Sequence, residues 1–150
     1  MPLSGRDIQT CATIMTTSEP WTRYGISHDS AATLWSEALT TGATVHVARL
    51  AEQTVGFAWY IARAGFGLSG YLKLLGVSAT ARGHGIGTTL LAHTEQLTLA
   101  DSQRDLLLLV SDFNLAAQRF YQQHGYSRVG ALAAYVVPDV TELIYHKRLA

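Results

Sequence analysis

The stretch Leu74–Leu91 constrains the fold of this chain more than any other, because its residue pattern changes twice. An apolar run ends at Val77, the glycine-rich segment Arg82-Gly83-His84-Gly85-Ile86-Gly87 follows, and an apolar-periodic segment begins at Thr88. This order predicts a strand, a tight turn and a helix. Glycine removes the side chain where a backbone bends sharply or approaches a ligand closely. The first amides of the helix, its dipole and the Arg82 guanidinium would together suit phosphate oxygens.

Two known phosphate-binding motifs can be compared with this spacing. The loop of nucleoside triphosphatases requires a lysine after its last glycine, but Gly87 is followed by Thr88-Thr89, which excludes it. A dinucleotide fingerprint needs an acidic residue after the next strand, which Asp112 could supply behind Leu106–Val110. However, its third glycine should stand one position later, and too little chain follows for a doubly wound sheet. A glycine-rich turn without a ligand is the remaining alternative.

A second motif follows the apolar run that ends at Val110. It reads Asn114-x-x-Ala117-x-x-Phe120-Tyr121-x-x-x-Gly125-Tyr126. The pattern predicts a short helix over Leu115–Gln123, which Gly125 ends. On such a helix, adjoining parts of one face carry Ala117, Phe120, Tyr121 and His124. A buried aromatic pair that closes a core would explain Phe120 as well.

Together, these two motifs resemble the acyl-CoA site of the GNAT (GCN5-related) N-acetyltransferases. The specific resemblance covers about Tyr71 to Tyr126. It implies an α/β (α+β) fold with a mixed, mostly antiparallel central sheet of about six to seven strands, flanked by about four helices. Two parallel strands of this sheet are splayed. We expect one such domain over residues 1–150.

The resemblance also implies a binding site for acetyl-CoA as co-substrate. The pantetheine arm would pair with the backbone of Leu75, Gly76 and Val77, and the glycine loop would hold the pyrophosphate. The second motif would complete the site. The remaining expected cofactor contacts are therefore Arg82, Gly83, His84, Gly85, Ile86, Gly87, Thr88, Asn114, Ala117, Phe120 and Tyr121.

Tyr121 stands where many members of the family carry a tyrosine that protonates the departing thiolate as general acid. Its alternative role is packing, with a hydrogen bond to the sulfur. The general base is not assigned by the resemblance. Many members carry a glutamate where this chain has Lys73, and lysine is a poor base for another amine unless it is desolvated. The acceptor could instead lose its proton to water, His28, Tyr24 or Glu37.

Further acceptor contacts are expected from an N-terminal connection and from the strand before the glycine loop. Lys73 would then favour an acceptor with a carboxylate or phosphate, unless its side chain extends to the surface. Core packing is the alternative role of the two N-terminal aromatic residues. The candidate residues are Trp21, Tyr24, His28, Tyr71 and Lys73.

The resemblance implies an N-acetyltransferase in which a primary amine attacks the thioester directly. A small-molecule amine is the favoured acceptor. A peptide N-terminus is the alternative, because the segments SEPW-TRYG and Tyr135-Val136-Val137-Pro138 faintly resemble those of ribosomal-protein N-terminal acetyltransferases. An alternative function from a different class is that of a non-catalytic, acyl-CoA-binding regulatory domain.

Composition and charge agree with one soluble core. Of the 150 residues, 48% are hydrophobic, and 11 basic residues balance 11 acidic ones. Such a chain has no global field that attracts nucleic acid or an anionic membrane. Cys11 is the single cysteine, and the six histidines form no close pairs, so we expect no disulfide and no metal site. The sequence has no signal-like N-terminus and no membrane span, so the expected location is the cytoplasm. We expect a monomer or homodimer.

The remaining elements follow from hydrophobic periodicity. Ser4 should cap a first helix, and the strand that usually precedes it should be very short or missing. The connection Thr16–Ser27 leads to a second helix, capped by Asp29 or Ser30 and ended by Gly42. The helix after Gly87 should bury Leu90, Leu91, Thr94 and Leu97. The expected strands are Thr44–Leu50, Thr54–Ala62, Tyr71–Val77, Leu106–Val110, Arg128–Ala134 and Thr141–Arg148, with a loop over Ala64–Gly70.

Overall fold

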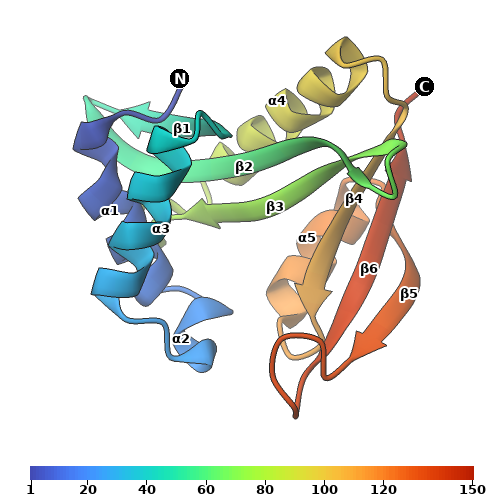
Figure 1. The fold of residues 1–150 in the computed structure, drawn as a ribbon. Helices are drawn as coiled ribbons and strands as arrows, with labels where there is room; N and C mark the ends of the chain where they lie inside the picture. Colours follow the sequence, from blue (N-terminus) through green and yellow to red (C-terminus); the bar gives the residue numbers. More distant parts are fainter. The chain divides into compact units, whose positions relative to one another are not determined.

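The computed structural model describes all residues from Met1 to Ala150 (Figure 1). The chain divides into two compact units, which we describe separately. Unit 1 contains Met1–Ile61 and Leu74–Thr94, and unit 2 contains Ala62–Lys73 and Glu95–Ala150. The helices are α1 (Ile8–Thr16), α2 (Trp21–Tyr24), α3 (His28–Thr40), α4 (Ile86–Ala100) and α5 (Leu115–Gln123). The strands are β1 (Thr44–Leu50), β2 (Gln53–Gly65), β3 (Ser69–Val77), β4 (Asp105–Ser111), β5 (Ser127–Ala133) and β6 (Thr141–Arg148).

The predicted fold class is confirmed. Six strands form one sheet in the order β1-β2-β3-β4-β6-β5. β3 and β4 are the parallel pair, with Gly70–Leu72 opposite Leu106–Leu108. β1 with β2, β4 with β6, and β5 with β6 are antiparallel.

Unit 1 is built around aromatic side chains that α1 and α3 cover from one face of the strands (Figure 1). The Trp35 ring lies 4.6 Å from that of Phe57 and 5.7 Å from that of Trp59. Residues at alternate positions of β2 point to the other face, where a Cβ on Gly56 would meet Ile86 and Leu90 of α4. The strands therefore carry helices on both faces.

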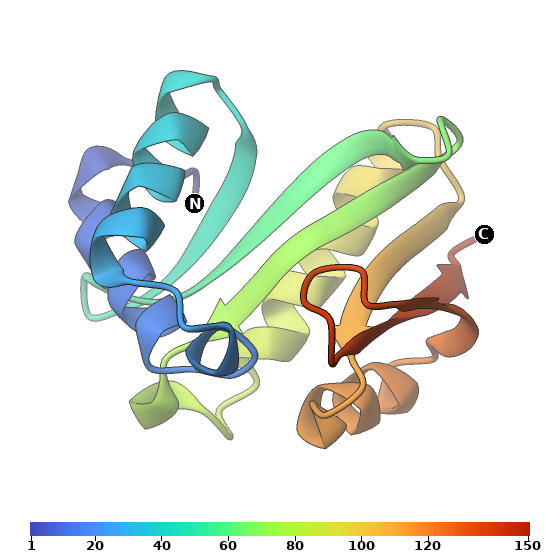
Figure 2. The ribbon, with the colours of Figure 1, turned by 60° about the horizontal axis from the view of Figure 1, so that its bottom comes forward.

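Unit 2 packs α5 against β4, β5 and β6 (Figure 2). Alternate residues of β4 and β6 are buried, and Gln122 of α5 donates a hydrogen bond to the Tyr145 hydroxyl at 3.4 Å. Paired residues of neighbouring strands share one face. The face toward α5 thus carries Leu106, Leu108, Val110, Leu143 and Tyr145.

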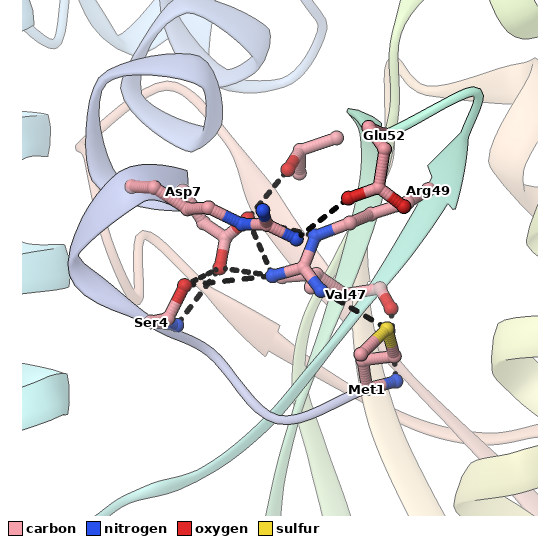
Figure 3. A network of polar contacts seen from close by, with 8 residues as sticks. Met1, Ser4, Asp7, Val47, Arg49 and Glu52 are labelled. Carbon is pink, nitrogen blue, oxygen red and sulfur yellow. Dashed lines mark hydrogen bonds and ion pairs between the residues drawn. The ribbon is translucent and has the colours of Figure 1, made fainter.

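The N-terminal segment of unit 1 is held by a buried ion pair (Figure 3). The Asp7 side chain has no exposed surface, and Arg49 Nη2 lies 2.8 Å from its Oδ2. Thr54 Oγ1, Ser4 Oγ and the Ser4 amide also donate to this carboxylate. Because these donors come from the N-terminal turn and from two strands, one carboxylate ties the start of the chain to β1 and β2.

Several element boundaries differ from those predicted. Ser27, rather than Asp29 or Ser30, caps α3, because its hydroxyl accepts from the Ser30 amide. β2 and β3 extend almost to the turn at Phe66–Leu68, so the predicted loop over Ala64–Gly70 was too long. A one-turn helix, α2, adds a fifth helix where only a connection was expected.

Two further details of the predicted elements changed. In α4, Thr98 is fully buried while Leu97 is only half-buried, because the inward face shifts along the last turns. Ser4 precedes a short 3-10 turn, Gly5–Asp7, before α1 begins. The first strand is reduced to one bridge between Pro2 and His46. Among the helices, none combines the length and the apolar composition that crossing a membrane requires.

Candidate active site

The glycine loop of unit 1 has the backbone that its sequence predicts. A 3-10 turn, Ala79–Ala81, is followed by extended Arg82, and α4 begins at Ile86. Gly83 and Gly85 have φ angles of 80° and 76°. A Cβ on either residue would meet no protein atom within 4 Å. The positive φ angle therefore favours glycine at both positions, whereas internal packing does not require it.

The loop presents the start of α4. The Thr89 amide donates to the Gly85 carbonyl at 3.0 Å, and this is the first bond of the helix. The amides of Ile86 and Gly87 precede this bond, and as first amides of the helix they have no acceptor within it. Together with the helix dipole, they favour an anion at this end.

Arg82 braces the loop as well as bordering it. Its Nη2 donates to Ser18 Oγ at 3.0 Å, and its Nε donates to the Val77 carbonyl at 3.3 Å. His84 turns inward in a similar way, with Nδ1 3.0 Å from the Arg82 carbonyl. Both residues remain exposed, so their side chains also border the loop.

The end of β3 packs closely against the core of unit 1. A Cβ on Gly76 would come within 2.5 Å of the Phe57 ring, so no larger residue fits there. Leu75 and Val77 point to the opposite face and are half-buried.

In unit 2, Asn114, which the sequence suggested as a cofactor contact, also has a structural role. Its Oδ1 accepts from the Ala117 amide at 3.2 Å and so caps α5. Gln118 Nε2 donates to the Asp112 carbonyl at 2.9 Å. The loop between β4 and α5 is thereby fixed from both sides.

Tyr121 lies in an aromatic cluster on α5. Its ring centroid is 5.2 Å from that of Phe120 and 5.7 Å from that of Tyr126. The residue is buried, and this burial raises the pKa of its phenol above the usual value. The phenol oxygen forms no hydrogen bond within the protein, whereas Tyr126 donates to Glu95 at 2.9 Å. Tyr121 thus keeps a protonated hydroxyl without an internal acceptor.

The predicted acceptor residues fall into two groups. In unit 1, Trp21 is half-buried with its ring 5.8 Å from Phe57, which supports the packing role, and Tyr24 is half-buried. His28 is exposed at the start of α3. In unit 2, Tyr71 is half-buried and Lys73 is exposed, and both lie on the same side of β3.

The structure adds Glu142, which the sequence did not single out. This residue is only 4% exposed, lies opposite Ser111 in the β4–β6 ladder, and accepts from its hydroxyl. The one sequence signal was an acidic residue directly before the apolar run at 143–145. That signal is weak, because strand ends often carry charged residues.

Comparisons with known proteins agree with the two motifs. Residues 41–128 match the sequence model of the acetyltransferase (GNAT) domain. A GNAT-family acetyltransferase from Desulfovibrio desulfuricans is 20% identical, with a TM-score of 0.82 over 98% of this chain and 95% of that one. No curated protein matches the sequence.

Two further solved structures have the same fold. Ribosomal-protein-alanine N-acetyltransferase from Brucella melitensis is 23% identical, with a TM-score of 0.77 over 99% of this chain and 98% of that one. An aminoglycoside 6'-N-acetyltransferase complexed with coenzyme A is 17% identical, with a TM-score of 0.81 over 100% of this chain and 96% of that one. At these identities, the likeness establishes the fold.

Proposed function

The chain belongs to the GNAT acetyltransferase family, and from this we propose that it transfers the acetyl group of acetyl-CoA to a primary amine. The observation that carries the proposal is the glycine loop inside the matched segment. Its two left-handed glycines lead into the first amides of α4, and nothing in the protein fills the space outside them. This arrangement suits the pyrophosphate of a coenzyme A thioester.

The proposed reaction needs no covalent enzyme intermediate. The backbone of Leu75–Val77 would hold the pantetheine arm, and one of its N–H groups would bind the acetyl oxygen as it gains negative charge. The amine attacks the carbonyl carbon, and the carbon–sulfur bond breaks. Tyr121, whose phenol is protonated and has no internal acceptor, then gives its proton to the departing thiolate.

A small-molecule amine is the acceptor class that we favour, and a peptide N-terminus is the second candidate. The similar folds include one protein named for aminoglycosides and one named for ribosomal protein. Exposed Tyr135 and Val136, in the connection between β5 and β6, offer an apolar surface that either acceptor could contact. A panel of amines and alanine-terminated peptides, followed by thiol release from acetyl-CoA, would rank the two classes. Binding of acetyl-CoA without turnover of any acceptor would instead support a regulatory domain.

Gly85→Val should weaken acetyl-CoA binding at least about tenfold, which corresponds to about 1.4 kcal/mol. A β-branched side chain resists a positive φ and would occupy the space proposed for the phosphates. Isothermal titration measures the change directly.

Gly67→Val provides the matched control. Gly67 has a φ of 77°, and a Cβ added there would also meet nothing within 4 Å, but the residue lies in the turn between β2 and β3. The control therefore imposes the same backbone strain outside the proposed site. Equal affinity in wild type and Gly85→Val, or equal losses in both variants, would remove the loop from the cofactor site.

A further inference from the structure

Two histidines of unit 1 meet in space although 47 positions separate them in the chain. His46 lies on β1 and His93 lies in the middle of α4. The Nδ1 atom of His46 is 3.2 Å from the Nε2 atom of His93, and the ring centroids are 4.3 Å apart. Both residues are half-buried, so both rings border solvent. The sequence predicted no metal site because its histidines are scattered, and the fold removes the basis of that prediction.

The hydrogen bond between these two rings is bent. In a straight N–H···N bond, each ring centre lies behind its own nitrogen on the line of the bond, so the centres are much farther apart than the nitrogens. Here the ring centroids are only slightly farther apart than the nitrogens, and the ring planes cross at 66°. The two nitrogens therefore do not point straight at each other, and such misalignment weakens a hydrogen bond. A ligand that takes both nitrogens has only this weak bond to replace.

The separation of the two nitrogens suits one shared metal ion. A metal binds an imidazole nitrogen at about 2.0–2.1 Å, and tetrahedral or octahedral geometry then places two neighbouring nitrogens about 2.9–3.4 Å apart. The observed 3.2 Å lies inside this range. The χ2 torsion of histidine is broad, so rotation of the rings can turn both lone pairs toward one ion. No group of three or more histidine, cysteine or carboxylate side chains is arranged to hold a metal in this protein, so water would complete the coordination.

A second histidine of the chain also lies beside a possible metal ligand, but its surroundings are different. In unit 2, His146 Nε2 lies 2.7 Å from Asp105 Oδ1. Arg148 Nε donates to the same oxygen at 2.6 Å. This guanidinium already occupies the carboxylate and repels a further cation. His146 therefore serves as the matched control for the histidine pair.

We infer that His46 and His93 bind one divalent transition-metal ion of the class that imidazole prefers, such as Cu²⁺, Ni²⁺ or Zn²⁺, and that this ion joins β1 to α4. Ions that prefer oxygen ligands, such as Mg²⁺, should not bind there. On binding, the proton between the two rings passes to solvent, and each nitrogen gives its lone pair to the metal. The site has two protein ligands, and the Met1 ammonium lies at the neighbouring Val47 carbonyl, so the affinity should be modest. The inference does not depend on the proposed acetyl transfer.

Thermal unfolding of the chain without an affinity tag, at about pH 7.5 where histidine is mostly neutral, tests the site. NiCl₂ at about 1 mM should raise the Tm of wild type by at least about 3 °C, whereas the same concentration of MgCl₂ should leave it unchanged. His93→Gln and His46→Asn each keep a polar atom near the position of the metal-binding nitrogen but remove the imidazole. Each should abolish most of the shift, and the double variant should lose no more than either single one. His146→Gln should keep the wild-type shift.

Three results of this titration would overturn the inference. They are a shift that keeps its wild-type size in both single variants, an equal shift with MgCl₂, and no shift of wild type with Ni²⁺, Cu²⁺ or Zn²⁺. If the variants do not fold, nuclear magnetic resonance of wild type decides the question. Substoichiometric Ni²⁺, which is paramagnetic in water, should broaden the imidazole signals of His46 and His93 before those of the other histidines. Earlier broadening at another histidine would place the metal elsewhere and contradict the proposed site.

Discussion

Tyr121→Phe is expected to lower the turnover number about 10²-fold, with little change in fold or in acetyl-CoA affinity. The phenol oxygen of Tyr121 forms no hydrogen bond within the protein, so its removal breaks no internal contact and leaves the ring packed against Phe120 and Tyr126. Burial raises the pKa of the phenol, which keeps it protonated but makes it a weaker acid. The expected loss is therefore at the low end for a positioned general acid. Single-turnover kinetics under saturating acetyl-CoA measure the chemical step itself.

Tyr126→Phe is the matched control for this prediction. It removes the same atom from the neighbouring ring, but that phenol donates to Glu95, which also accepts from Lys147 at 3.0 Å. The control should therefore lower stability and leave the single-turnover rate close to that of wild type. An unchanged rate in Tyr121→Phe would reduce Tyr121 to a packing residue.

Asp7→Asn should lower the free energy of unfolding by about 3–5 kcal/mol near neutral pH. The change leaves the Arg49 side chain, which is 8% exposed, without its anion inside unit 1 (Figure 3). Burial by itself would raise the pKa of Asp7, but hydrogen bonds from Thr54, Ser4 and Arg49 outweigh it and lower the pKa from 3.8 to about 2. Urea unfolding of both proteins measures the difference.

The same prediction has a defined pH dependence. The pKa of Asp7 is lower in the folded chain, so its ionised form stabilises the fold above about pH 4, and that contribution is lost as the pH falls toward 2. The difference between wild type and Asp7→Asn should shrink over this range. Glu52→Gln is the control, because the Arg6–Glu52 pair is exposed and should contribute less than about 1 kcal/mol. Equal effects of the two substitutions would contradict a special role for the buried pair.

The sequence by itself determined the elements that depend on local chemistry. Gly83 and Gly85 have positive φ angles because only glycine adopts them readily, and Asn114 caps α5 through a bond to a residue three positions away. Such interactions join near neighbours, so residue spacing is sufficient to predict them. Strand alternation also placed Tyr71 and Lys73 on one side of β3. The two motifs also indicated the family and the proposed cofactor-binding residues.

Boundaries and minor elements were less predictable, because tertiary packing competes with local preference there. Ser27, Asp29 and Ser30 are all good helix caps, and only the folded backbone selects Ser27. Glycines at 65, 67 and 70 indicated a long loop. In the structure, a Cβ on Gly65 would meet Leu107 and Ser69, so this glycine serves close packing inside β2.

Only the tertiary structure decided which distant groups meet. Asp7 lies 42 positions from Arg49, Ser111 lies 31 from Glu142, and Arg82 lies 64 from Ser18. Before folding, each of these polar residues resembles any other surface residue, because no periodicity marks its partner. Strand register brings the end of β4 and the start of β6 together and so places Ser111 opposite Glu142, where both side chains are buried. Desolvation is a property of the packed state, and for that reason it was not visible in the sequence.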